Sequence, residues 1–134
     1  MNNMESQKSK IKSQKLGTAH TSDLKTRCYK FAIAVLQYVD SFPSKQSAWV
    51  IADQLARSST SVGANLIEAR SASLRKEFKW FNEVSLKSAN ESIYWLALSR
   101  DVKIGDKTEA EQLISECTEL AKMIASGVIK LKHS

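Results

Sequence analysis

Four polar residues in the middle of the chain, Arg57, Ser61, Asn65 and Glu68, have the spacing of one helical stripe. At about 100° per residue they fall within about 80° of the helix circumference. Serine and asparagine lower helix propensity because their side chains compete for backbone hydrogen bonds, so a cluster of them needs compensating partners. We therefore expect a buried or half-buried hydrogen-bonded network, the alternative being a stripe that only faces water.

The other residue types that carry chemistry are scattered. His20 and His133 lie at opposite ends of the sequence, and there is no glycine-rich phosphate loop, zinc-ligand spacing, or Ser/His or Cys/His arrangement. Glu68, Glu77 and Glu91 are candidate carboxylate ligands, but a di-iron bundle needs repeated Glu-x-x-His pairs, which the chain lacks. We therefore predict that the protein is not an enzyme and holds no metal or cofactor.

The cysteines and the apolar runs indicate where the protein resides. Cys28 and Cys117 lie in apolar helical contexts, where buried reduced thiols are expected. No apolar run reaches the roughly 18–20 residues of a membrane span, and the N-terminus lacks the apolar core of a signal peptide. These features predict a cytoplasmic protein with no membrane partner.

Apolar residues at three- and four-residue steps predict four helices, over residues 22–41, 44–70, 74–103 and 106–132. Short links, the first of them at Pro43, predict an antiparallel up-down-up-down bundle. Ser73 is expected to cap the third helix and Asp106 the fourth. The core face of the third helix is predicted to contain Leu74, Phe78, Phe81, Ser85, Ser88, Ala89, Ser92 and Leu96.

The third helix carries a second stripe, roughly 100° from this core face. It consists of Trp80, Val84, Trp95, Leu98 and Val102. A bundle needs only one wide apolar stripe per helix, and tryptophan is enriched at protein contacts. We therefore expect this stripe to be a subunit interface, the alternative being a broad core face. Glu91 lies within the stripe, and Arg57 is a candidate ion-pair partner for it across a helix or subunit contact.

The chain divides into a tail over residues 1–21 and a bundle over residues 22–134. The tail is rich in Ser, Gln and Lys with few apolar residues, so it is predicted to be disordered. Half of the net charge of +6 lies there, as Lys8, Lys10, Lys12 and Lys15 against Glu5. These lysines are candidate nucleic-acid contacts, whereas the body is nearly balanced in charge and has no dense Lys/Arg stripe.

Several segments resemble the four-helix-bundle family known from the intervening sequences of bacterial 23S ribosomal RNA genes, also labelled S23 ribosomal proteins. They are residues 54–57, 61–68, 77–78 and 87–96, together with Phe42 and Pro43. The specific part of this resemblance is the polar pattern of Arg57, Ser61, Asn65 and Glu68. Glu91 lies in the last of the matching segments. The chain departs from the family at Ala69, where the family often has glycine. It also departs at Asn82 and Ser85, which replace residues that are commonly apolar or alanine in the family.

The resemblance covers roughly residues 29–131 and implies a homopentamer, with bundles in a ring around a central opening. The fold is also similar to that of the accessory protein of diversity-generating retroelements, a basic pentamer that binds nucleic acid and a reverse transcriptase. Likeness of fold alone does not establish a shared function. We expect a non-catalytic oligomeric scaffold that binds RNA or a ribonucleoprotein. The alternative is a protein-interaction accessory subunit, for example of a reverse transcriptase, without its own nucleic-acid specificity.

Overall fold

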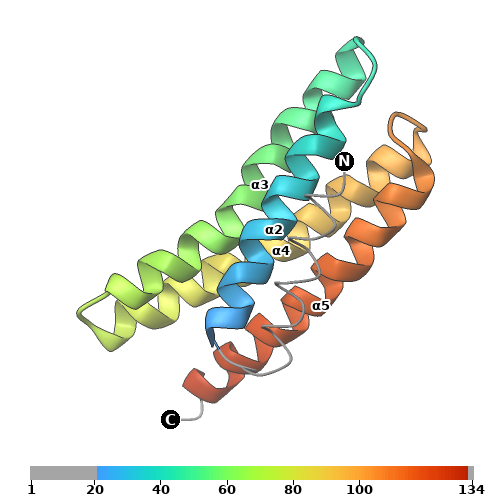
Figure 1. The fold of residues 1–134 in the computed structure, drawn as a ribbon. Helices are drawn as coiled ribbons and strands as arrows, with labels where there is room; N and C mark the ends of the chain where they lie inside the picture. Colours follow the sequence, from blue (N-terminus) through green and yellow to red (C-terminus); the bar gives the residue numbers. More distant parts are fainter. Residues whose placement is uncertain (1–20, 133–134) are drawn as a thin grey trace, which may run out of the picture.

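Four helices make up most of the part of the chain that the structure, a computed structural model, describes, which is residues 21–132 (Figure 1). They are α2 (Thr21–Asp40), α3 (Gln46–Ser71), α4 (Arg75–Asp101) and α5 (Lys107–Lys132). Each helix begins and ends within two residues of the predicted bounds. The predicted all-α four-helix bundle is confirmed, and the described residues contain no strand.

The predicted tail lies outside the described residues, except for Thr21, which begins α2. The candidate nucleic-acid contacts Lys8, Lys10, Lys12 and Lys15 therefore have no described position, and neither do His20 and His133. Within residues 21–132, none of the helices is both long enough and apolar enough to cross a membrane.

Consecutive helices run in opposite directions, as the short links predict (Figure 1). The α2–α3 and α4–α5 links lie at one end of the bundle, and the α3–α4 link lies at the other. The helices pack in sequence order, and α2 also contacts α5, which closes the bundle. Arg27 of α2 and Glu116 of α5 fasten this last contact through two N–O hydrogen bonds, of 2.7 and 3.1 Å.

The N-terminal capping residue agrees with the sequence prediction at α5 but not at α4. Asp106 caps α5 as predicted, since its carboxylate accepts a hydrogen bond of 2.9 Å from the Glu109 backbone N–H. The predicted Ser73 cap is wrong, because Leu74 occupies the cap position of α4 and makes no side-chain cap bond. The backbone of Leu74 is extended there, so its side chain leaves the helical face and is exposed. The placement of Leu74 in the core was therefore wrong.

The core lies between the inward stripes of all four helices and contains large side chains from each of them. Its members include Phe31, Val35, Leu55, Leu96 and Leu120. Tyr38 is fully buried near the end that holds the α4–α5 link, and its hydroxyl lies 2.7 Å from the Ser99 hydroxyl. This pair satisfies two buried polar groups that would otherwise lower the free energy of unfolding.

Candidate functional site at the α3–α4 face

The serines of α3 and α4 form a line of hydrogen bonds between the two helices, which we call the serine seam. It consists of Ser58 and Ser61 on α3 and Ser85, Ser88 and Ser92 on α4. The Ser88 hydroxyl donates to Ser61 Oγ at 2.9 Å, and the Ser85 hydroxyl donates to the Val62 carbonyl oxygen at 2.7 Å. Because these side chains are small and their hydroxyls are satisfied, α3 and α4 can pack closely without a purely apolar contact.

The polar stripe of α3 divides into a half-buried part and an exposed part. The Asn65 amide donates to both the carbonyl and the hydroxyl oxygen of Ser61, each at 2.8 Å, and so extends the seam. Arg57 and Glu68 are exposed in the single chain, where Arg57 pairs with Asp53 at 3.3 Å. The network that the sequence predicts thus includes Ser61 and Asn65 but, within one chain, neither Arg57 nor Glu68.

Glu91 of α4 lies on the outer side of the same seam. It is exposed, and its carboxylate accepts a hydrogen bond of 3.1 Å from the Trp95 indole N–H. Since Arg57 pairs with Asp53, the Arg57–Glu91 ion pair considered from the sequence does not form inside one chain. Glu91 and Trp95 instead form a polar and aromatic pair at the rim of the bundle.

The apolar stripe of α4 continues this surface, and we call the whole of it the α3–α4 face. The face comprises Arg57, Ser61, Asn65 and Glu68 of α3 with Trp80, Val84, Glu91, Trp95, Leu98 and Val102 along α4. Trp80 is 59% exposed and Val102 is exposed, whereas Val84, Trp95 and Leu98 are half-buried. Trp95 packs against the core with its inner side. The stripe is therefore neither fully core nor fully covered in a single chain.

Nothing in the described part of the chain is arranged for metal or thiolate chemistry. Among residues 21–132, no group of three or more His, Cys, Asp or Glu side chains is placed to hold a metal ion. Burial raises the pKa of the Cys28 thiol and of the Cys117 thiol to about 12, so both stay protonated at neutral pH. Cys117 donates a hydrogen bond of 3.2 Å to the Ala89 carbonyl oxygen. Both thiols thus serve packing.

A second feature, which we call the basic end, lies around the α3–α4 link. The chain from Arg70 to Lys79 contains four basic residues and one acidic residue. The Cys117–Ala89 bond shows the antiparallel register of α4 and α5, in which the first turns of α4, with Lys79, lie at the same end of the bundle as the last turns of α5, with Lys130 and Lys132. The basic end therefore comprises Arg70, Arg75, Lys76, Lys79, Lys130 and Lys132.

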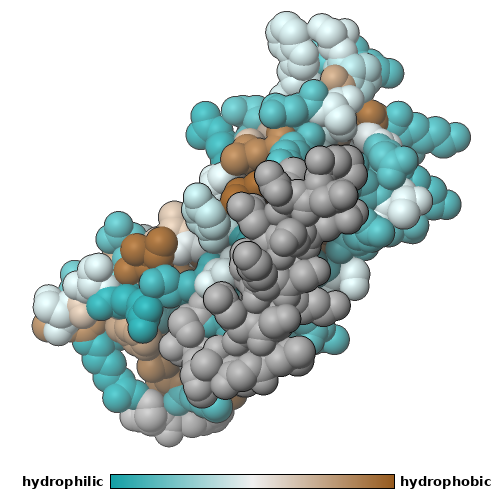
Figure 2. Space-filling view, viewed as in Figure 1, coloured by the Kyte–Doolittle hydropathy of each residue, from teal (hydrophilic) through white to brown (hydrophobic). Residues whose placement is uncertain are grey.

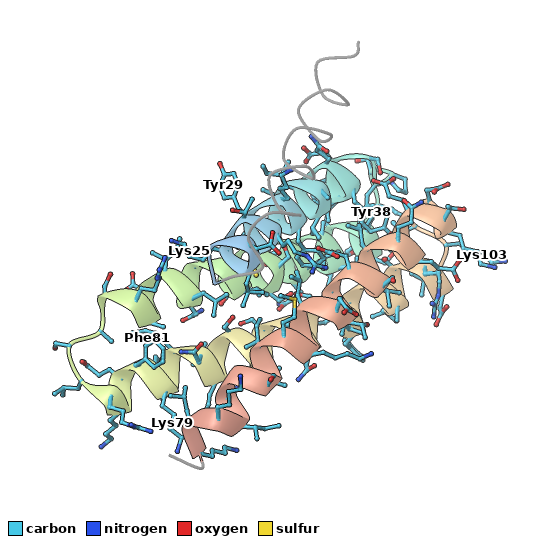
Figure 3. The ribbon with its side chains drawn as sticks, turned by 60° about the horizontal axis from the view of Figure 1, so that its bottom comes forward. Lys25, Tyr29, Tyr38, Lys79, Phe81 and Lys103 are labelled. Carbon is cyan, nitrogen blue, oxygen red and sulfur yellow. The ribbon has the colours of Figure 1, made fainter. Side chains whose placement is uncertain are left out.

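The opposite end of the bundle has a different charge balance. Residues 100–111 contain three basic and four acidic residues, and Arg100 pairs with Asp101 at 2.9 Å. Figure 3 shows the two ends through Lys79 and Lys103, which lie far apart along the bundle. Because α2 begins at the basic end, the tail with its four further lysines joins the described chain there.

Sequence reasoning missed the basic end because its charges come from three helix termini, the end of α3, the start of α4 and the end of α5, rather than from one stripe. The signal was present in the basic residues on both sides of the 72–74 link and in the last turn of α5. It also missed that Tyr29, Ile33 and Leu36 of α2 are exposed. Their spacing of four and three residues marks a second apolar face on that helix, away from its core face.

Comparison with known proteins identifies relatives of this chain. Residues 5–126 match the family described as 23S rRNA-intervening sequence protein. A crystal structure of a protein of unknown function from the S23 ribosomal protein family of Bacteroides thetaiotaomicron is similar, with a TM-score of 0.73 and 30% identity. That similarity covers 78% of this chain and 97% of the other. Among curated proteins, none matches the sequence. The chain therefore belongs to the family of 23S rRNA-intervening sequence proteins.

Proposed function

We propose that this protein is a non-catalytic oligomeric scaffold that binds RNA or a ribonucleoprotein through its basic end. The observation that carries the proposal is the gathering of six basic side chains at one end of the bundle. Cations of this kind bind phosphates by displacing condensed counterions, without the need for a deep pocket. Family membership supports RNA as the nucleic acid, since the family is named for a sequence within 23S rRNA genes.

Oligomerisation is the second part of the proposal, and the α3–α4 face supports it. Trp80 and Val102 leave apolar surface in water at both ends of the stripe, and a neighbouring copy would cover it. The likeness to a pentameric family favours a ring of five. Such a ring holds five basic ends together with five tails, a formal charge of +30 from five copies of +6.

The buried reduced thiols Cys28 and Cys117 suit a reducing compartment, which supports action in the cytoplasm. In the alternative role of an accessory subunit, the scaffold would bind a reverse transcriptase or another protein. The experiments below distinguish this accessory role from RNA binding.

An RNA titration over rising salt tests the basic end. The variant R70Q/K76Q/K79Q removes three of its cations. The matched control K45Q/K103Q/K107Q removes three cations from the opposite end, with the same change in net charge. The slope of log affinity against log salt should decrease in magnitude by about 2 in the first variant, for each copy that contacts a single strand. The control should keep the slope of the natural protein.

Two outcomes would contradict the RNA-binding proposal. Equal decreases in the salt slope in both variants would mean that RNA binding depends on the net charge of the protein and not on the basic end. Absence of RNA binding, together with retention of a protein from nuclease-treated lysate, would favour the accessory-subunit role.

A further inference from the structure

A groove between α2 and α3 is an apolar surface that the proposed function leaves unused. Tyr29, Ile33 and Leu36 of α2 and Ile67 of α3 line it and are all exposed, Tyr29 by 70% and Ile67 by 53%. Tyr29 projects away from the bundle in Figure 3, and apolar patches lie over α3 and its border with α2 in Figure 2. A single subunit thus leaves this second apolar surface, as well as the α3–α4 face, in contact with water.

Small residues make the groove concave. Gly63 and Ala64 of α3 line it together with Ala32 of α2. At Gly63 the two helices are so close that an added Cβ would lie 3.3 Å from Cys28 Cβ. Because the helices approach closely and the side chains between the rims are short, the groove can receive a ridge of larger side chains from another helix.

The charges of the groove and of the α3–α4 face are complementary. Lys25 is the one charged residue among those that line the groove. On the α3–α4 face, Glu68 is exposed, and the Glu91 carboxylate accepts a bond from the neutral Trp95 indole. The groove therefore offers a cation without a lining carboxylate, and the face offers the carboxylates of Glu68 and Glu91, since its own cation, Arg57, is paired with Asp53.

We infer that the α2–α3 groove of each copy receives the α3–α4 face of the next copy, so that subunits join head to tail. The inference rests on the proposed oligomer and identifies its second surface. A ring requires two different surfaces that fit each other, whereas a two-fold dimer pairs one surface with itself. Face-to-face pairing would leave Tyr29, Ile33, Leu36 and Ile67 in water, but head-to-tail pairing covers both apolar surfaces.

The helix register favours one contact in particular. Cys28 lies against Gly63, and α2 and α3 run antiparallel, so Lys25, three residues earlier, lies level with Leu66. If the bundles stand side by side in a ring with their axes parallel, equal levels of neighbouring copies meet. Lys25 of one copy then lies near Glu68 of the next, at almost the same level.

Two variants of the full chain test the pairing by sedimentation velocity. The groove variant I33K/I67K places charges on the rim of the groove, and the face variant W80K/V102K places them on the α3–α4 face. All four positions are exposed in the single chain, so the fold should persist, as circular dichroism can verify. The control I129K replaces an exposed apolar residue of α5 outside both surfaces and should sediment like the natural protein.

Each variant alone should sediment as a monomer of about 15.0 kDa. An equal mixture should form pairs of twice that mass, because the intact face of one variant fits the intact groove of the other. A groove variant that keeps the natural size, beside a monomeric face variant, would overturn the head-to-tail inference and leave the α3–α4 interface standing. If both variants keep the natural size, both proposals fail. Two monomeric variants that do not pair in the mixture would also overturn the inference.

Discussion

Gly105, in the link between α4 and α5, packs against the buried ring of Tyr38, and its replacement by alanine should destabilise the fold strongly. A Cβ at this position would overlap Tyr38 Oη and would lie 2.6 Å from Tyr38 Cε1. Tyr38 is fully buried and hydrogen-bonded to Ser99 at 2.7 Å, so the ring cannot move without breaking that bond. Gly105 has no positive φ, so the expected cost is steric and not conformational.

The loss in the free energy of unfolding is the sum of two contributions. Breaking the buried Tyr38–Ser99 hydrogen bond costs about 1 kcal/mol. Forcing an extra methyl group into a well-packed site costs about 1–3 kcal/mol more. G105A should therefore lose about 2–4 kcal/mol in urea denaturation followed by circular dichroism. All proteins are compared at one concentration, because an oligomer's stability depends on it.

A second glycine provides the matched control. Gly127 lies within α5, and a Cβ there would meet no atom within 4 Å. G127A should therefore raise the free energy of unfolding by about 0.5–1 kcal/mol through helix propensity alone. Adding Y38F should cost less in the G105A background than in the natural chain, since the hydrogen bond is already lost. If G105A and G127A had similar stabilities, the proposed packing of Gly105 on Tyr38 would be refuted.

Three further predictions concern the end of α4, the thiols and the α2–α5 contact. Lys103 has a φ of 61°, which favours glycine, so K103G should raise the free energy of unfolding by about 1 kcal/mol; no gain would argue against a strained backbone there. Because the pKa of Cys28 and of Cys117 is raised from 9.0 to about 12 in the folded protein, the unfolded chain loses these protons first. The contribution of the thiols to stability should be constant below about pH 8 and should be lost between pH 9 and 12, so the fall in stability over that range should be shallower when both cysteines are replaced by alanine. E116Q should lose about 1 kcal/mol by weakening the half-exposed ion pair to Arg27, and a loss that does not shrink in 1 M salt would point to packing instead.

The helices were predictable because each buries one stripe of regular spacing. The core face of α4 follows that spacing in its buried members, which are Ser85, Ser88, Ala89, Ser92 and Leu96. Ser99 extends the core face by one more step. Sequence reasoning failed at Leu74, where a residue at the helix boundary takes an extended backbone and leaves the periodic face. Periodicity gives no information on such end geometry, which the backbone conformation of the link decides.

The candidate site was predictable in its positions but not in its pairings. The spacing placed Arg57 and Glu91 toward the same side of the bundle, yet Asp53 on the same helix is the partner that Arg57 contacts. Charged side chains are long, and several partners lie within their reach, so spacing does not select one. The basic end escaped detection for a related reason, since only the antiparallel packing of α4 and α5 brings the start of α4 and the last turn of α5 to the same end of the bundle.

The most direct test of the central claim, that another copy covers the α3–α4 face, is sedimentation equilibrium of the full chain at micromolar concentration. We predict a single species whose mass is a multiple of 15.0 kDa, and a ring of five copies gives five times 15.0 kDa, about 75 kDa. A stable monomer of 15.0 kDa with Trp80 still accessible to a collisional quencher would contradict the claim.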